Sequence, residues 1–160
     1  MGFSFEVTGL SELERSLGKL GERGQEIAAE GLYEGAGLMA DKVGQAVRGI
    51  ATEKFKYATG GKKRKPSPEE KEILLKARTG IAKFRKGGTN VQTSVGMQNS
   101  GYAQLGSKTK PIPQIANAIN SGTSFMQKQP FFRKAVSQAT GPAKAAIEQT
   151  ITQKIEETEL

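Results

Sequence analysis

The feature that most constrains the fold is a segment from about residue 22 to residue 51 in which apolar residues recur at helical spacing. Its apolar stripe comprises Ile27, Leu38, Met39, Val43, Val47 and Ile50. The same segment carries the small residues Ala28, Gly31 and Gly35, separated by three and four positions. Residues at that spacing lie on one face of a helix. We therefore predict one long helix with a smooth groove, against which a strand or another helix packs closely.

Other segments predict strands. Residues 3–7 alternate apolar and polar side chains, which is typical of a half-buried strand. Residues 81–86 and 91–97 are predicted to form two strands joined around Gly87-Gly88, and residues 102–105 are a shorter candidate. Because strands and helices are segregated along the chain, we expect the α+β class. The expected architecture is an antiparallel sheet of about three to four strands, packed against the long N-terminal helix and a C-terminal helix.

Start and stop signals predict the shorter helices. The sequence Ser67-Pro68-Glu69-Glu70 has a capping serine, then a proline, then a glutamate at the third helical position. This helix should run to about Arg78, with Gly80 as a stop signal. Apolar spacing predicts further helices over about residues 11–20 and from about residue 112 to Gly122. We expect residues 106–113 to form a loop.

The composition argues against an enzyme. The chain has no cysteine and no histidine, and Asp41 is its only aspartate. Thiol nucleophiles, the commonest general base and clustered carboxylates for metal ions are therefore missing. Residues 101–109 resemble a phosphate-binding loop, but Ser107 separates Gly106 from Lys108, and two following prolines oppose the required helix. We predict no catalytic residues, no cofactor and no metal.

The length of 160 residues suits a single domain over residues 1–160. The apolar fraction is only 36% and the chain contains 20 glycines, so we expect a modest core with some stability supplied by partners. No apolar run approaches the length of a membrane-spanning helix, and the N-terminus lacks the pattern of a signal peptide. We therefore expect a soluble cytoplasmic protein without a membrane partner.

Positive charge is concentrated in one region. Residues 52–88 hold 12 of the 24 Lys and Arg residues but only 4 of the 16 acidic residues, while the rest of the chain balances. We expect a basic arm to protrude at about residues 52–78. It could be a solvated loop, or it could contact an acidic protein surface or nucleic-acid phosphates on which its aromatic rings stack. The candidate contact residues are Phe55, Tyr57, Lys62, Lys63, Arg64 and Lys65.

A motif near the C-terminus has an architectural character. A break at Gly122-Thr123-Ser124 is followed by a polar loop and then by Pro130-Phe131-Phe132-Arg133. Proline suits the first position of a helix, and two aromatic residues beside it indicate a firmly docked helix end. We predict a helix from Pro130 that is interrupted at Gly141-Pro142 and then resumes, with the aromatic residues holding it to the sheet.

In their order along the chain, the motifs resemble the small tail-completion, or head–tail joining, proteins of long-tailed bacteriophages. The similarity rests on Gly9-Leu10-Ser11-Glu12-Leu13 after the first strand, on Gly122-Thr123-Ser124, and on Pro130-Phe131-Phe132-Arg133-Lys134-Ala135. Three positions depart from the pattern, since Asn120 replaces a glutamate, Ser121 replaces an aromatic residue and Gln129 replaces an arginine of the family. These departures bear on salt bridges that family members could form at interfaces.

The resemblance implies a structural virion protein that forms a ring, usually hexameric, between the capsid connector and the tail tube. Its implied partners are copies of itself, connector or neck proteins, and a tail terminator or tail tube protein, with non-specific contact to DNA in the channel. Its implied location is the neck or tail of the virion, and the host cytoplasm during assembly. The alternative is a free nucleic-acid-binding accessory protein that acts through Lys62–Lys65.

Overall fold

The computed structural model describes residues 2–4, 11–54, 61–87, 90–98 and 101–159. The helices are α1 (Ser11–Lys19), α2 (Glu22–Arg48), α3 (Pro68–Ala77), α4 (Ile112–Ser121) and α5 (Phe131–Glu159). The strands are β1 (Gly2–Ser4), β2 (Thr79–Ile81), β3 (Arg85–Gly87), β4 (Asn90–Gln92), β5 (Ser94–Met97), β6 (Tyr102–Leu105) and β7 (Lys108–Pro111). The predicted mixture of helices and antiparallel strands is confirmed. No helix in these ranges is long and apolar enough to cross a membrane.

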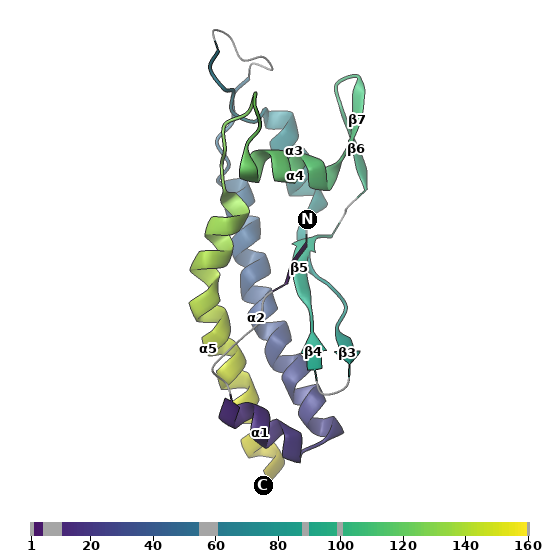
Figure 1. Ribbon diagram of the computed structural model, residues 1–160, viewed down its shortest axis with the longest axis vertical. Helices are drawn as coiled ribbons and strands as arrows, with labels where there is room; N and C mark the ends of the chain where they lie inside the picture. Colours follow the sequence, from purple (N-terminus) through teal and green to yellow (C-terminus); the bar gives the residue numbers. More distant parts are fainter. Residues whose placement is uncertain (1, 5–10, 55–60, 88–89, 99–100, 160) are drawn as a thin grey trace.

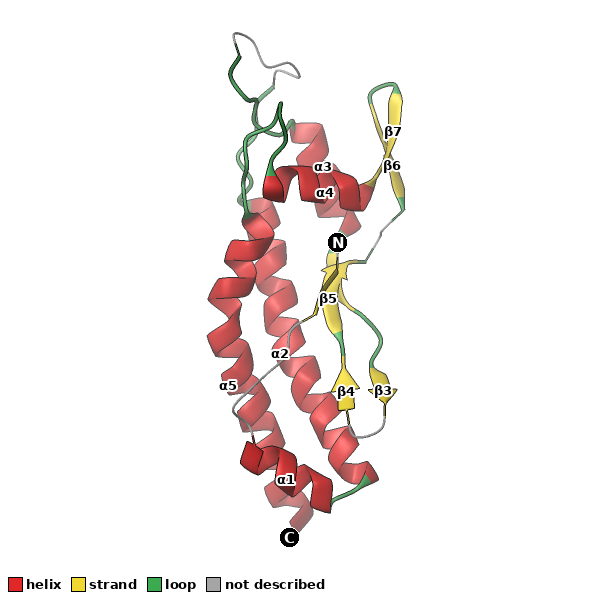
Figure 2. Ribbon diagram, viewed as in Figure 1, coloured by secondary structure: helices red, strands yellow, loops and turns green. Residues whose placement is uncertain are grey.

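The molecule is elongated, and α2 and α5 form its spine (Figure 1). They run side by side along most of its length, and α1 crosses one end of the pair near the C-terminus. At the other end lie α3, α4 and the β6–β7 hairpin. The strands from β2 to β5 lie along one side of the spine, as Figure 2 shows. The two ends of the molecule are therefore built from different parts of the chain.

The predicted groove of small residues is confirmed as the contact between α2 and α5. A Cβ atom on Gly35 would lie 2.6 Å from Cγ1 of Ile147, and one on Gly31 would lie 2.7 Å from Cγ1 of Ile151. Real Cβ atoms essentially never come so close to another heavy atom. Glycine at these two positions therefore lets the isoleucines of α5 sit directly on the backbone of α2.

The expectation that all the strands share one sheet of about three to four strands is wrong. The strands divide into three short sheets, with the orders β1-β5-β2, β3-β4 and β6-β7, and every pairing is antiparallel. Among the strand residues whose side-chain burial is described, Val95 is the buried apolar one. It packs with Ala36 and Met39 of α2 and Ala139 and Ala143 of α5. The strands bury too little apolar surface to support one wide sheet.

The expectation that residues 106–113 form a loop is wrong, because Lys108–Pro111 pairs with Tyr102–Leu105 as the second strand of a hairpin.

The expected interruption of the last helix is also wrong. Helix α5 begins at Phe131 rather than Pro130, and it continues through Pro142 without interruption. Pro142 has no N–H to donate to the carbonyl of Gln138, and both residues are exposed to water. The buried residues Ala139 and Ala143 keep the helix docked on the opposite face.

The predicted start of α3 is confirmed, and its end lies within one residue of the predicted one. The Ser67 hydroxyl accepts from the Glu70 N–H, and the Glu70 carboxylate accepts from the Ser67 N–H, so the capping box is complete. The helix ends at Ala77, and Arg78 adopts a φ of 53° that turns the chain directly into β2. Gly80 lies within that strand and is not the stop signal.

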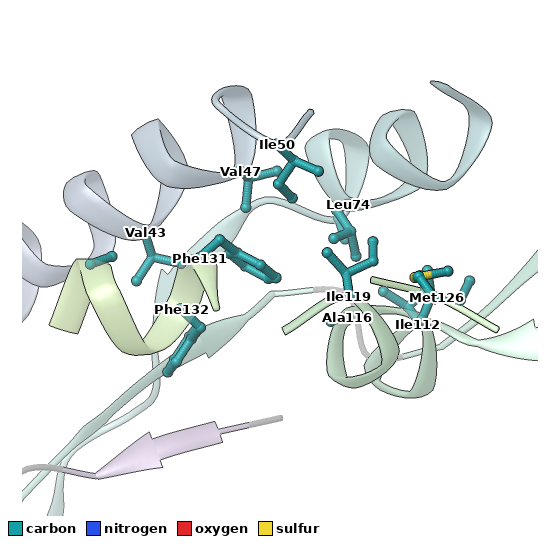
Figure 3. Packing of buried hydrophobic residues seen from close by; sticks show 13 residues of the cluster. Val43, Val47, Ile50, Leu74, Ile112, Ala116, Ile119, Met126, Phe131 and Phe132 are labelled. Atoms are coloured by element: carbon teal, nitrogen blue, oxygen red, sulfur yellow. The ribbon is translucent and has the colours of Figure 1, made fainter. Parts of the chain in front are cut away.

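The larger core lies at the end of the spine where α2, α3, α4 and α5 meet (Figure 3). Phe131 and Phe132 pack there edge to face, with ring centroids 6.4 Å apart. Phe131 lies between Val47 of α2 and Ile119 of α4. Most of the buried side chains in this cluster come from helices rather than from the sheet to which we expected these residues to hold α5, and Met97 of β5 and Ala103 of β6 pack against it partly buried.

We expect Gly35→Ala to destabilise the protein by about 1–3 kcal/mol relative to Gly44→Ala, because the new methyl group overpacks the contact with Ile147. Gly44 is the control, since it lies in the same helix and no atom within 4 Å would meet its Cβ. Gly44→Ala should raise stability by roughly 0.5–1 kcal/mol through helix propensity alone. Urea unfolding of both variants measures the difference, and equal stabilisation of the two would contradict the close contact.

Candidate partner-binding surfaces

The part of the predicted basic arm that carries Lys62, Lys63, Arg64 and Lys65, here called the basic segment, lies at the end of the molecule distant from α1 (Figure 1). The Arg64 N–H donates to the carbonyl of Phe125 over 2.8 Å, and the Gln127 N–H donates to the carbonyl of Arg64 over 2.8 Å. These bonds form an isolated parallel bridge between Arg64 and Met126. The basic segment therefore lies directly beside the loop that follows Gly122-Thr123-Ser124.

Arg64 forms a nearly buried ion pair with Glu70 at the start of α3. Its Nη1 and Nη2 atoms each lie 2.8 Å from one carboxylate oxygen of Glu70, which is the bidentate geometry. The Glu70 side chain is only 4% exposed, and the Arg64 side chain is 18% exposed. The same carboxylate closes the capping box of α3. Arg64 therefore fixes the basic segment to the fold, and its charge is already compensated.

The environment of Glu70 favours its charged form. Burial alone would raise the pKa of this carboxyl, but the hydrogen bonds from Arg64 and the Ser67 backbone, with the charges of Arg64 and Lys110, outweigh it. The pKa of Glu70 therefore lies below its ordinary value of 4.5. The resulting stabilisation is complete above the ordinary pKa and is lost as pH falls through the lowered one.

The other predicted contact residues have different environments. The Lys65 ammonium lies 3.9 Å from Oε1 of Glu53, and the Lys65 N–H donates to the same side chain. Lys62 and Lys63 are exposed and form no ion pair with any described residue. Phe55 and Tyr57 lie outside the described residues. The four cations of this segment therefore divide into a structural one, a partly compensated one and two that face solvent.

One exposed aromatic residue beside this segment was missed from the sequence. Phe125 is 70% exposed, and its carbonyl accepts the bond from Arg64. The only sequence signal was an aromatic residue within a polar loop. The structure places it next to the basic segment, because residues 64 and 126 pair across the two loops.

The Gly122-Thr123-Ser124 motif forms the turn between α4 and this loop. Gly122 has a φ of 77°, and a Cβ atom there would lie 3.1 Å from Cβ of Lys128. The Thr123 hydroxyl accepts from the backbone N–H groups of Phe125 and Met126, at 3.1 and 3.0 Å. Ser124 is exposed and follows the turn. Glycine and threonine at these two positions therefore have a conformational role.

Asn120 caps α5 from a neighbouring helix. Its Oδ1 atom accepts from the N–H of Phe132 at 3.1 Å and from that of Arg133 at 3.5 Å. The carbonyl of Pro130 accepts the first helical bond from Lys134, so Pro130 occupies the N-cap position. Proline has no side-chain acceptor for the second and third N–H groups, which an N-cap side chain ordinarily binds. Asn120 supplies that acceptor in its place, while Arg133 itself is exposed.

Gln129, which replaces the family's arginine, also makes intramolecular hydrogen bonds. Its Oε1 accepts from the N–H of Ala51 at 3.0 Å, and its Nε2 donates to the carbonyl of Ala51 at 2.8 Å. Its own N–H donates to the carbonyl of Ile119. Gln129 therefore ties the chain after α2 to α4 and to the start of α5. Asn120 and Gln129 join parts of one subunit.

A second surface lies nearer the other end of the spine, and sequence reasoning missed it. An open groove with a volume of about 460 Å³ is lined by Glu30, Tyr33 and Glu34 of α2, Phe84, and Lys154 of α5, among others. The Tyr33 and Phe84 rings lie 6.3 Å apart and are tilted by 46°. Tyr33 is 55% exposed. The groove therefore combines two aromatic faces with two carboxylates.

Neither surface contains a described cluster that could bind a metal ion. Within the described parts of the chain, no group of three or more His, Cys, Asp and Glu residues could hold a metal ion. Searches with models of protein families, with curated protein sequences and with solved structures found no match to this chain. The resemblance to tail-completion proteins therefore stays a prediction.

We expect Glu70→Gln to lower stability at neutral pH by about 3 kcal/mol, because it leaves Arg64 without a charged partner in a largely buried site. The difference from the wild type should shrink as pH falls from about 4.5 through the lowered pKa of Glu70, since the folded wild-type carboxylate then also becomes protonated. Urea unfolding across pH measures it. Glu72→Gln is the control on the same helix, because the Glu72 side chain is 62% exposed. A pH-independent difference would refute the charged pair.

We expect Asn120→Ala to cost about 1–2 kcal/mol, because the first turn of α5 loses the acceptor for two backbone N–H groups. Asn117→Ala is the matched control, since Asn117 lies on the same helix and is exposed. It should change stability by no more than about 0.5 kcal/mol. Thermal unfolding of the two variants gives the comparison, and similar losses would show that the cap contributes little.

Proposed function

We propose that this chain is a structural virion protein: a ring-forming tail-completion, or head–tail joining, subunit between the capsid connector and the tail tube of a bacteriophage. It would act in the neck or tail of the virion after assembly in the host cytoplasm. Its partners would be other copies of itself in a hexameric ring, and the neighbouring neck, tail terminator or tail tube proteins. DNA passing through the ring would make non-specific contacts.

The observation that carries this proposal is the ordered set of motifs that resembles the family. Two of them, Gly122-Thr123-Ser124 and Pro130-Phe131-Phe132-Arg133, belong to a single joint between α4 and α5. Thr123 holds the turn, and Phe131 and Phe132 fill the core beside it. An architectural role for both motifs supports a structural protein over a catalyst.

The structure also supports contact with other proteins. Large apolar side chains are exposed at separate places, including Tyr102 in β6 at 74%, Phe125 at 70% and Tyr33 in α2 at 55%. The β6–β7 hairpin projects from one end of the molecule (Figure 1). A two-stranded hairpin is marginally stable by itself, so contact with a neighbour would stabilise it. A subunit of a ring would cover such features with adjacent copies.

The nucleic-acid-binding alternative is weaker than the sequence suggested. Of Lys62, Lys63, Arg64 and Lys65, only the first two are free of carboxylate partners among the described residues. Affinity for phosphates depends on the number of cations that they neutralise. Within Lys62–Lys65, the two remaining lysines provide few contacts for a protein that would bind nucleic acid through this segment.

We expect the purified protein to form a closed oligomer, either free or on isolated phage tails. Light scattering and native mass spectrometry measure the free protein, and electron microscopy of tails that carry it shows whether it adds a ring. A ring requires a repeated heterologous contact that closes by rotation. A chain that remains monomeric in solution and on tails would exclude the proposed function.

A further inference from the structure

The molecule is electrically polarised from one end to the other. Residues 11–34 and 148–159, which lie at the end that carries α1, hold ten acidic and four basic residues, and residues 83–86 beside Tyr33 add three basic residues. Residues 51–54, 61–78 and 101–129, which contribute to the opposite end, hold 11 basic and four acidic residues. The net charges are therefore −3 and +7, and the overall charge of the chain conceals this separation.

The groove is the built feature of the acidic half. Glu30 lies 3.5 Å from the ammonium of Lys154, at the edge of the groove. Glu34 is exposed, lines the same groove and makes no ion pair with a described residue. The aromatic faces of Tyr33 and Phe84 stand beside these carboxylates. Carboxylates next to aromatic faces attract an ammonium group through ion pairing and through the ring quadrupole.

The complementary feature is at the basic end. Lys62 and Lys63 are exposed cations on a backbone segment that Arg64 anchors at both its main chain and its side chain. Along α2 alone, Glu34 lies about 20 Å from Arg48, where the helix ends. The basic segment begins beyond that point. One molecule therefore cannot bring its own Lys62 and Lys63 into its own groove.

We propose that a second copy of this chain occupies the groove, with its Lys62 and Lys63 seated against Tyr33 and Phe84 and paired with Glu30 and Glu34. This inference rests on the proposed ring-forming function and names the surfaces that make the ring. The contact is heterologous, because it joins different surfaces of two identical molecules, and each copy keeps one free groove and one free basic segment. Such a contact repeats until rotation closes it.

Charge complementarity selects a second copy over a nucleic acid. A polyanion can use only the basic end, and the carboxylates of the groove repel it. A second copy uses both ends at once. The contact also explains why two carboxylates stand beside the exposed Tyr33 ring in a chain with an excess of positive charge.

The test uses two charge-reversed variants of the full chain. One carries Glu30→Lys with Glu34→Lys in the groove, and the other carries Lys62→Glu with Lys63→Glu in the basic segment. Each variant alone faces like charge with like charge, so we expect self-association to weaken by more than about tenfold. Mixed in equal amounts at low salt, the two variants should assemble, because every contact then joins opposite charges. Native mass spectrometry and sedimentation velocity report the species.

The control is Glu12→Lys with Glu14→Lys in α1, which changes the net charge equally at the same end but outside the groove. This control should associate like the wild type. If the control is as defective as the groove variant, or if the mixture stays monomeric while the wild type assembles, the assigned surfaces are wrong and the ring-forming function stands. If the wild type itself never assembles, both proposals fail. Assembly of the mixture also shows that the variants fold.

Discussion

The close approach of α2 and α5 is the interaction on which the rest of the structure depends. Gly31 and Gly35 let Ile151 and Ile147 rest on the α2 backbone, so two long helices share one continuous interface. Among the strand residues whose side-chain burial is described, Val95 is the one that adds to the buried apolar core. Because the sheets are small, the helix pair must carry the core. It also sets the length of the molecule and thereby separates its two ends.

At one end of this spine, polar side chains join four segments that are distant in the sequence. Asn120 of α4 caps α5, Gln129 binds the backbone of Ala51 after α2, and Arg64 binds Glu70 at the start of α3. Around them lie Phe131 and Phe132 in the larger core. The joint is therefore specified by hydrogen bonds and filled by aromatic side chains. It holds the exposed Lys62 and Lys63 on an ordered support, which suits a surface that meets another protein.

Architecture and electrostatics together favour a structural role. The residues that resemble family motifs form turns, caps and core contacts, and the described residues contain no metal-binding cluster. The polarised charge and the aromatic, acidic groove provide two unlike surfaces on one chain. Two unlike, complementary surfaces are what a ring of identical subunits requires. The basic residues that sequence reasoning assigned to one arm therefore divide, because Arg64 is structural while Lys62 and Lys63 face solvent.

The sequence by itself determined features that depend on local chemistry: the long α2 helix with its small-residue groove, the capping box at Ser67 and Glu70, and the helix that ends before Gly122. Only the tertiary structure decided features that depend on distant partners. Helix α5 continues through Pro142 because Ala139 and Ala143 are buried against neighbours. Arg64 is structural because Glu70 is buried beside it. A local sequence pattern sets the propensity of a segment for helix, strand or turn, whereas burial and ion pairing depend on which surfaces the fold brings together.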